Sequence, residues 1–321
     1  MIHARALTRR FKIKGGEVEA VRGLDLDVEP GTLVAFLGPN GAGKSTSLRM
    51  LTSLLPPTSG TAVVAGHDVA SDPAGVRRNI GYVGQKNGAG ENFRVLDELV
   101  TQARCYGLTR DEARRRAREV LDMLELTSLA TRKPGTLSGG QRRRLDIALG
   151  LVHRPGLLFL DEPTTGLDPQ SRADVWGHIL RLREEHGTTL FLTTHYLEEA
   201  DSMAERVVII DHGRVIADGT AARLKTDLAG DHVTLTLRDP GDTARATAIA
   251  TRLEAPGEAA AEGTTVRVRV PRADVALPRL LRALEAEGVE VAAAETARPT
   301  LDDVFLTLTG RSLRETDGDG A

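Results

Sequence analysis

The sequence has little cysteine, few aromatic residues and no long hydrophobic run. One cysteine, Cys105, occurs among 321 residues, which excludes an internal disulfide and suits a reducing compartment such as the cytoplasm. We expect this thiol to be a small buried hydrophobe. No apolar run approaches the roughly 18 residues that a membrane helix needs, and no apolar segment of signal-peptide length lies near the N-terminus. We therefore expect neither a membrane span nor a secretory signal.

A strong excess of basic charge is also absent. Lysine and arginine total 42 against 45 aspartates and glutamates, for a formal net charge of -3. This balance argues against a nucleic-acid partner. Hydrophobic residues make up 40% of the chain, enough for a substantial core, and 321 residues suggest about two domains.

The first part of the chain, residues 1–228, alternates short apolar runs with longer segments of helical period, which predicts an α/β domain. Expected strands are 18–28, 33–37, 61–64, 81–83, 157–160, 189–193 and 207–211. Expected helices are 45–54, 96–106, 110–124, 138–152, 169–185 and 196–204.

The composition changes after residue 225, and residues 229–312 predict a small α+β domain. Its expected strands are 233–238, 265–270 and 289–293, and its expected helices are 242–253, 275–287 and 301–309. We expect a solvated loop over 254–263, a capping box from Thr300 to Asp303 that opens the last helix, and a disordered tail over 313–321.

A glycine-rich segment between an expected strand and an expected helix matches the phosphate-loop pattern G-x-x-x-x-G-K-[ST]. Its residues are Gly38, Pro39, Asn40, Gly41, Ala42, Gly43, Lys44 and Ser45, followed by Thr46. Backbone N–H groups of such a loop point at phosphate oxygens. Lys44 would neutralise the β and γ phosphates, and Ser45 would ligate Mg²⁺. A plain glycine-rich turn is the alternative.

Two carboxylates follow the apolar run 157–160 directly. Asp161 and Glu162 thus lie at the carboxyl end of an expected buried strand, where α/β sheets build their sites. Asp161 would hold Mg²⁺, and Glu162 could take a proton from an attacking water. The alternative is an acid that caps the next helix.

The segment Ser138, Gly139, Gly140 and Gln141 has the pattern of a capping box. A capped helix start presents free N–H groups and a positive dipole end to an anion, and adjacent glycines allow close approach. Because Lys44 already marks one phosphate site, a second such site indicates composite binding.

Leu137 to Gln141, followed by three arginines and Leu145, resembles the signature of ATP-binding cassette (ABC) ATPases. The resemblance covers about residues 5–225 and implies a P-loop ABC-type fold, with a mixed sheet core and a helical subdomain. It also implies ATP and Mg²⁺ as cofactors, and a dimer in which the signature of one copy closes on the nucleotide held by the other.

Further landmarks of the family occur in order. The resemblance implies that Gln85 contacts Mg²⁺ and water and couples to a membrane partner, although Gly84 replaces a common proline. Asp168 would touch the other subunit, and His195 would contact the γ-phosphate. Phe11 occupies the position of an aromatic residue that stacks on adenine. A structural histidine and a core phenylalanine are the alternatives.

Segments 196–201, 211–214 and 299–306 resemble drug-resistance ATP-binding subunits of the daunorubicin-exporter type. That resemblance implies a peripheral ATPase at the cytoplasmic face of a bacterial membrane, which powers a separate multi-span permease. Exporters of lipids or polysaccharides, importers, and soluble ABC ATPases acting on DNA, ribosomes or iron–sulfur assembly remain alternatives. The absence of a second cassette, a cysteine cluster and a basic tail argues against the soluble class.

Overall fold

The computed structural model describes residues 1–253 and 259–312. The chain divides into two compact units, Met1–Gly219 and a second that begins at Thr220. This division lies slightly ahead of the boundary expected after residue 228. The expected tail at 313–321 lies outside the described residues.

A six-stranded sheet forms the centre of the first unit. Its strand order is β10-β9-β3-β8-β7-β6, parallel except for the pairing of β10 with β9. The strands are β3 (Leu33–Leu37), β6 (Ile80–Val83), β7 (Leu157–Asp161), β8 (Thr189–Thr194), β9 (Arg206–Asp211) and β10 (Arg214–Gly219). All residues of β3, β7 and β8 are buried, which explains why these strands occur in the sequence as apolar runs.

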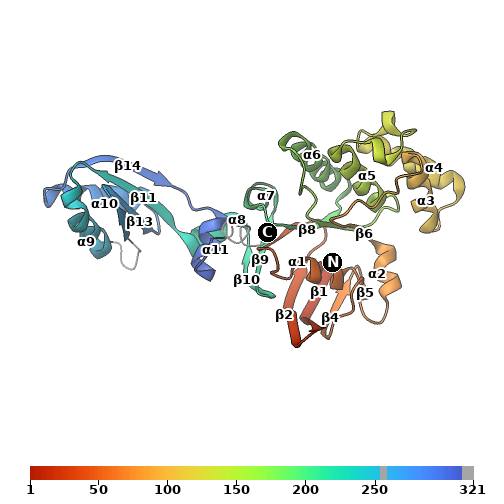
Figure 1. The fold of residues 1–321 in the computed structure, drawn as a ribbon, viewed down its shortest axis with the longest axis horizontal. Coiled ribbons are helices and arrows are strands. Elements are labelled where there is room, and N and C mark those ends of the chain that lie inside the picture. The colour runs from red at the N-terminus through yellow and green to blue at the C-terminus, as the bar shows by residue number, and fades with distance from the viewer. Residues whose placement is uncertain (254–258, 313–321) are drawn as a thin grey trace. The chain divides into compact units, whose positions relative to one another are not determined.

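An antiparallel sheet of order β2-β1-β4-β5 packs beside the central one. It contains β1 (Ile2–Ile13), β2 (Gly16–Val28), β4 (Ser59–Val64) and β5 (His67–Asp68). Helices α1 (Lys44–Leu51) and α2 (Pro73–Asn79) accompany it on this side of the central sheet (Figure 1). Both sheets and α1 contribute side chains to one core, which includes Ile2, Phe36, Leu48 and Phe159.

On the other side of the central sheet lies a group of helices (Figure 1). It comprises α3 (Val95–Cys105), α4 (Arg110–Met123), α5 (Gly139–Leu151) and α6 (Pro169–His186), and α5 packs against the other three. Helix α7 (Leu197–Met203) follows β8. The expected mixed sheet core with a helical subdomain is therefore confirmed.

Cys105 corrects one expectation. The residue ends α3 and is exposed, not buried. Val95, Leu99 and Ala103 form the buried face of α3, and position 105 falls outside their helical stripe.

Among its described residues, the second unit has a β-α-β-β-α-β core, preceded by α8 and followed by α11 along the chain. The order of its antiparallel sheet is β12-β13-β11-β14. Its strands are β11 (Asp231–Leu237), β12 (Ala259–Glu262), β13 (Thr265–Val270) and β14 (Val291–Ala297). Its helices are α8 (Ala221–Leu224), α9 (Thr243–Leu253), α10 (Ala273–Ala286) and α11 (Leu301–Thr309). Side chains of the strands and of α9 and α10 form a separate core.

The expected loop over 254–263 is partly wrong, because residues 259–262 form strand β12. They pair with β13 across a turn at Gly263, whose φ is 58°. The strand consists of three alanines and a glutamate, a composition with weak β preference. Pairing with β13 overrides that preference. The capping box from Thr300 to Asp303 is confirmed.

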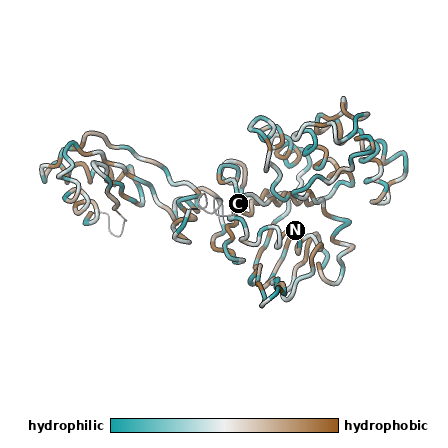
Figure 2. The backbone as a smooth tube through the Cα atoms, viewed as in Figure 1, coloured by the Kyte–Doolittle hydropathy of each residue, from teal (hydrophilic) through white to brown (hydrophobic). Residues whose placement is uncertain are grey.

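The sequence did not predict β1, β5, β10, α2 or α8. Within residues 1–253 and 259–312, the short elements are the 3₁₀ turns η1 (Thr127–Leu129), η2 (Pro134–Thr136) and η4 (Pro240–Asp242), and the π-helical turn η3 (Lys225–Ala229). Hydrophobic and hydrophilic residues alternate along both units (Figure 2). Among the described residues, no helix has the length and apolarity needed to cross a membrane.

Candidate active site

The phosphate-loop segment connects β3 to α1, as predicted. Gly43 precedes α1 with φ 104°, and a Cβ atom there would lie 2.5 Å from the Ala20 carbonyl oxygen. Only glycine suits this position. The loop borders a cavity of about 220 Å³, lined by Ala20, Pro39, Asn40, Gly41, Gly43, Lys44, Ser45, Thr46, Gln85 and Glu162. The structure therefore brings Gln85 and Glu162 to the loop, although both are distant from it in sequence.

Lys44 is buried and lines this cavity. Its ammonium donates to the Gly38 carbonyl at 2.7 Å and to the Pro39 carbonyl at 3.1 Å. The same nitrogen lies 3.6 Å from Glu162 Oε1. A buried cation needs such partners, and phosphate oxygens entering the cavity would compete with them.

Asp161 ends β7 and is 1% exposed. Its Oδ1 atom accepts hydrogen bonds from the Ser45 hydroxyl at 3.1 Å and from the Thr193 hydroxyl at 2.7 Å. Ser45 and Gln85 line the cavity, whereas Asp161 does not line it and meets it only through its contact with Ser45. One carboxylate with neutral oxygens is the ligand set that suits Mg²⁺, which usually takes one or two carboxylates and completes its shell with water and phosphate.

Glu162 has a left-handed backbone with φ 47°, a conformation that non-glycine residues adopt at a cost. Its N–H donates to the Thr193 hydroxyl at 3.0 Å. His195 Nδ1 lies 3.5 Å from Glu162 Oε1. The His195 ring, together with the Lys44 ammonium, holds the pKa of the Glu162 carboxyl below its ordinary value. Lys44, Glu162 and His195 thus form one polar cluster.

The remaining predicted site residues do not line this cavity. Ser138 caps α5: its hydroxyl accepts from the Gln141 N–H at 3.3 Å, and its own N–H donates to Gln141 Oε1 at 3.0 Å, so the capping box is confirmed. Ser138 and Gly139 are exposed. Asp168 caps α6 by accepting from the Ser171 N–H at 2.9 Å, which lowers the pKa of its carboxyl. Phe11 lies on β1, half-buried beneath the Arg9 guanidinium.

Sequence reasoning missed several buried polar residues around the site. Glu199 accepts from the Thr164 hydroxyl at 2.6 Å and from the Thr194 hydroxyl at 3.1 Å, which links the segments after Glu162 and before His195. Arg143 and Asp146 of α5 are also buried. Burial raises the pKa of the Asp146 carboxyl and lowers that of the Arg143 guanidinium. For Arg143, the sequence signal was its place in the run of three arginines after Gln141, and Asp146 showed only a charge within an expected helix.

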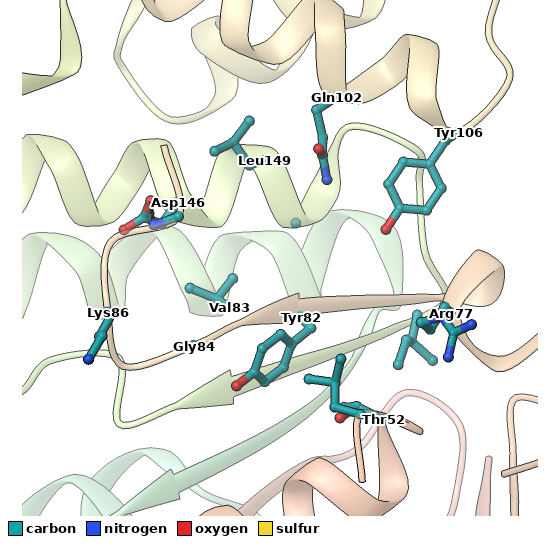
Figure 3. Close-up of a pocket in the computed structure, with 14 residues that line it drawn as sticks. Thr52, Arg77, Tyr82, Val83, Gly84, Lys86, Gln102, Tyr106, Asp146 and Leu149 are labelled. Carbon is teal, nitrogen blue, oxygen red and sulfur yellow. Dashed lines mark hydrogen bonds between the residues drawn. The ribbon is translucent and has the colours of Figure 1, made fainter. Parts of the chain in front are cut away.

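A second cavity, of about 280 Å³, lies beside the segment that carries Gln85. Gly84, Lys86 and Gly88 line it on one side, and Asp146, Leu149 and Gly150 of α5 on another. Gln102 and Tyr106 extend toward it from one side, and Tyr82 lines it from the strand below (Figure 3). This cavity mixes aromatic and polar groups and adjoins a residue of the first cavity's lining.

Comparison with known families decides what this arrangement is. Residues 21–165 match the ABC transporter family, and residues 219–309 match the C-terminal domain of DrrA1-3-like ATP-binding proteins. The daunorubicin resistance ATP-binding protein DrrA2 of Streptomyces coeruleorubidus is 43% identical, over 98% of this chain and 97% of that protein. The chain belongs to the DrrA family of ABC transporter ATP-binding proteins.

Two further comparisons agree with this assignment. The daunorubicin/doxorubicin resistance ATP-binding protein DrrA of Streptomyces peucetius is 46% identical, over 91% of this chain and 88% of that protein. The solved dimeric structure of the ATP-binding cassette MJ0796, in a post-hydrolysis state with ADP and Pi, is 28% identical with a TM-score of 0.63. It covers 68% of this chain and 98% of that cassette.

Membership in the DrrA family sets the activity. The chain is the ATP-binding subunit of an ABC exporter of the drug-resistance group, and it hydrolyses ATP to drive transport. ABC cassettes form dimers, as MJ0796 does. The expected family, fold class and enzymatic activity are thereby confirmed.

Proposed function

We propose that two copies of this chain close face to face on two ATP molecules, each bound between the phosphate loop of one copy and the signature of the other. The position of the signature supports this most directly. At the start of α5, the cap Ser138 and its neighbour Gly139 are exposed, but residues 138–141 do not line the cavity around Lys44 in their own chain. A second copy can place that anion-binding helix end against the phosphates.

Within each composite site, the loop N–H groups and Lys44 bind the phosphates. Ser45, Asp161 and Gln85 would hold Mg²⁺, which would offset phosphate charge. Glu162 orients the attacking water and takes its proton, while His195 and the opposing Ser138 and Gly140 N–H groups face the γ-phosphate. Phe11 stacks on adenine, and Asp168 contacts the second copy.

Mixing two inactive variants tests the composite site. Lys44→Ala removes phosphate binding, and Gly139→Glu places a negative charge at the start of α5. A Cβ atom at Gly139 has only an ordinary 3.5 Å contact with Leu167, whereas one at Gly140 would lie 2.7 Å from Ser171 Oγ. Gly139 is therefore the better position for a variant that folds.

Each variant alone has no complete site, but a mixed dimer has one. We expect an equimolar mixture to recover up to about a quarter of wild-type ATPase activity, because half the dimers are mixed and each contains one of two sites. A mixture as inactive as its components would refute the composite site. Gly139→Ala, which adds a methyl group without charge, is the matched control.

The transported substrate is a drug or antibiotic-like compound that passes through a separate multi-span permease. The chain would then work peripherally at the cytoplasmic face of a bacterial membrane. Resistance to daunorubicin in the names of the relatives supports this substrate class. The cavity beside Gln85, with Tyr82 and Tyr106 on its walls (Figure 3), is a suitable docking site for a permease segment.

Drug susceptibility tests the export function. A strain that lacks this gene should become more sensitive to such compounds, and the wild-type gene should restore resistance while Lys44→Ala should not. Unchanged susceptibility with altered lipid or polysaccharide export would favour that alternative exporter class. Recovery of the chain with ribosomes or DNA, and not with membranes, would favour a soluble ABC ATPase.

A further inference from the structure

Two charged side chains of α5 reach the segment that carries Gln85. Arg143 and Asp146 are three residues apart and therefore lie on one face of the helix. They are 6% and 4% exposed. Charged side chains are rarely buried to this extent unless they have specific partners.

Their partners are backbone groups on both sides of Gln85. The Arg143 Nη1 atom donates to the Gly84 carbonyl at 2.6 Å. Asp146 Oδ1 accepts from the N–H groups of Gly88 and Ala89, at 2.9 and 3.2 Å. One helix thus holds both ends of the short segment that contains Gln85.

Arg143 also holds the segment that contains Glu162. Its Nε atom donates to the Pro163 carbonyl at 2.7 Å, and Nη2 donates to the Asp161 carbonyl at 3.1 Å. A guanidinium can serve three carbonyls at once because its donors form a rigid planar fork. Lysine has the charge but not this geometry.

Helix α5 and strand β6 approach each other closely at Gly81. A Cβ atom at Gly81 in β6 would lie 2.3 Å from the Gly150 carbonyl oxygen of α5. The strand that leads to Gln85 therefore approaches the helix backbone directly. This backbone contact holds β6 against α5 in addition to the hydrogen bonds of the Arg143 and Asp146 side chains.

We propose that Arg143 and Asp146 are positioning residues that fasten two segments to helix α5, which begins at the signature. One segment contains Gln85 and the other is Asp161–Pro163. Both segments and the helix would then move together. Displacement of the Gln85 segment then reaches the start of α5 without an intervening flexible joint. Gly84, Gly88 and Asp146 also line the second cavity, so a segment docked there would act on this junction directly. The proposal rests on the ATPase assignment and not on the identity of the permease.

Amide hydrogen exchange and steady-state ATPase kinetics on the purified full chain test the proposal. Asp146→Ala removes the acceptor, and Asp146→Asn retains one. Asp68→Ala is the matched control, because Asp68 also accepts from two backbone N–H groups, of Ala70 and Ser71, but lies at β5.

We expect Asp146→Ala to speed exchange at residues 84–91 and to lower kcat roughly tenfold with less than about twofold change in KM for ATP. Asp146→Asn should restore most of the slow exchange and most of the wild-type kcat. Asp68→Ala should change neither. Arg143→Lys should lower kcat as Asp146→Ala does.

Loss of kcat in Asp68→Ala equal to that in Asp146→Ala would show a general stability effect and overturn the proposal. Faster exchange with unchanged kcat would also overturn it. If Asp146→Ala does not fold, Asp146→Asn and Arg143→Lys test the proposal instead. Only Arg143→Lys should lower kcat, and an equal kcat in the two variants would overturn the proposal. None of these readouts requires the permease, so they stand even if the export proposal fails.

Discussion

The Ser45 hydroxyl lies 3.1 Å from Asp161 Oδ1, although 116 residues separate the two in sequence. Ser45 comes from the first turn of α1, and Asp161 from the end of the buried strand β7. The contact therefore joins the two motifs that the sequence assigned to Mg²⁺. It also gives the metal assignment a direct test.

Asp161→Asn should weaken Mg²⁺ binding, because an amide lacks the charge of the carboxylate ligand. We expect the Mg²⁺ concentration for half-maximal ATPase activity to rise roughly tenfold or more. Binding of a fluorescent ATP analogue without metal should change little. A Mg²⁺ titration at saturating ATP measures the effect, and an unchanged midpoint would remove Asp161 from the metal site.

Glu162→Gln should stop hydrolysis while nucleotide binding persists. The amide retains the size of the side chain but cannot take a proton, so we expect kcat to fall at least about a hundredfold. Size-exclusion chromatography with ATP and Mg²⁺ should show a stable dimer of the variant. Hydrolysis at the wild-type rate would show that Glu162 is not the group that acts on water.

His153 should make stability depend on pH. Its Nε2 atom lies 2.9 Å from the Ile80 carbonyl, its ring stacks on Tyr106 with centroids 3.6 Å apart, and its buried Nδ1 has no hydrogen-bond partner. Burial is the main cause that lowers the pKa of this ring, and Arg116 adds to it. The folded state therefore favours neutral imidazole.

As the pH falls through about 6.5, unfolded His153 takes a proton that the folded ring does not, so the free energy of unfolding falls. His153→Phe keeps the stacking and removes this titration. We expect the loss of stability between about pH 7 and about pH 5 to be smaller in the variant. Urea unfolding at each pH measures it; parallel profiles for both proteins would contradict the assignment.

The second unit has its own core and should respond to mutation separately. Leu280 of α10 is fully buried there, and Leu280→Ala should cost about 2–5 kcal/mol. The single tryptophan, Trp176, is buried in the first unit. We expect circular dichroism to show an earlier partial transition while the tryptophan fluorescence midpoint stays in place.

Val275→Ala is the control for this prediction. Val275 lies on the same helix but is 49% exposed, so its truncation should have little effect on either signal. A shift of the fluorescence midpoint in Leu280→Ala as large as that in circular dichroism would contradict separate unfolding.

Most features that could be predicted from the sequence are patterns of neighbouring residues. The phosphate loop, the Asp161–Glu162 pair and the Ser138 capping box each depend on neighbouring residues, so their residue types reveal them. Strand β1 was not predicted, because Ala6, with φ 48°, interrupts its alternation of buried and exposed residues.

The anchors Arg143 and Asp146 could not be predicted for a different reason. Their partners are backbone carbonyls and N–H groups of segments far away in sequence, and backbone groups are the same for every residue type. Only the folded arrangement shows which of them face a charged side chain.

Lys44 already holds stand-ins for a ligand: two carbonyls of its own loop and the Glu162 carboxylate surround its ammonium. ATP binding at this lysine is thus an exchange of oxygen partners and not the filling of a bare charge. The contribution of Lys44 to ATP affinity would then be the difference between two interaction free energies, that of the ammonium with phosphate oxygens and that with the protein oxygens they replace. In the proposed site, this exchange would remove Lys44 as a partner of the Glu162 carboxylate and leave His195 beside it.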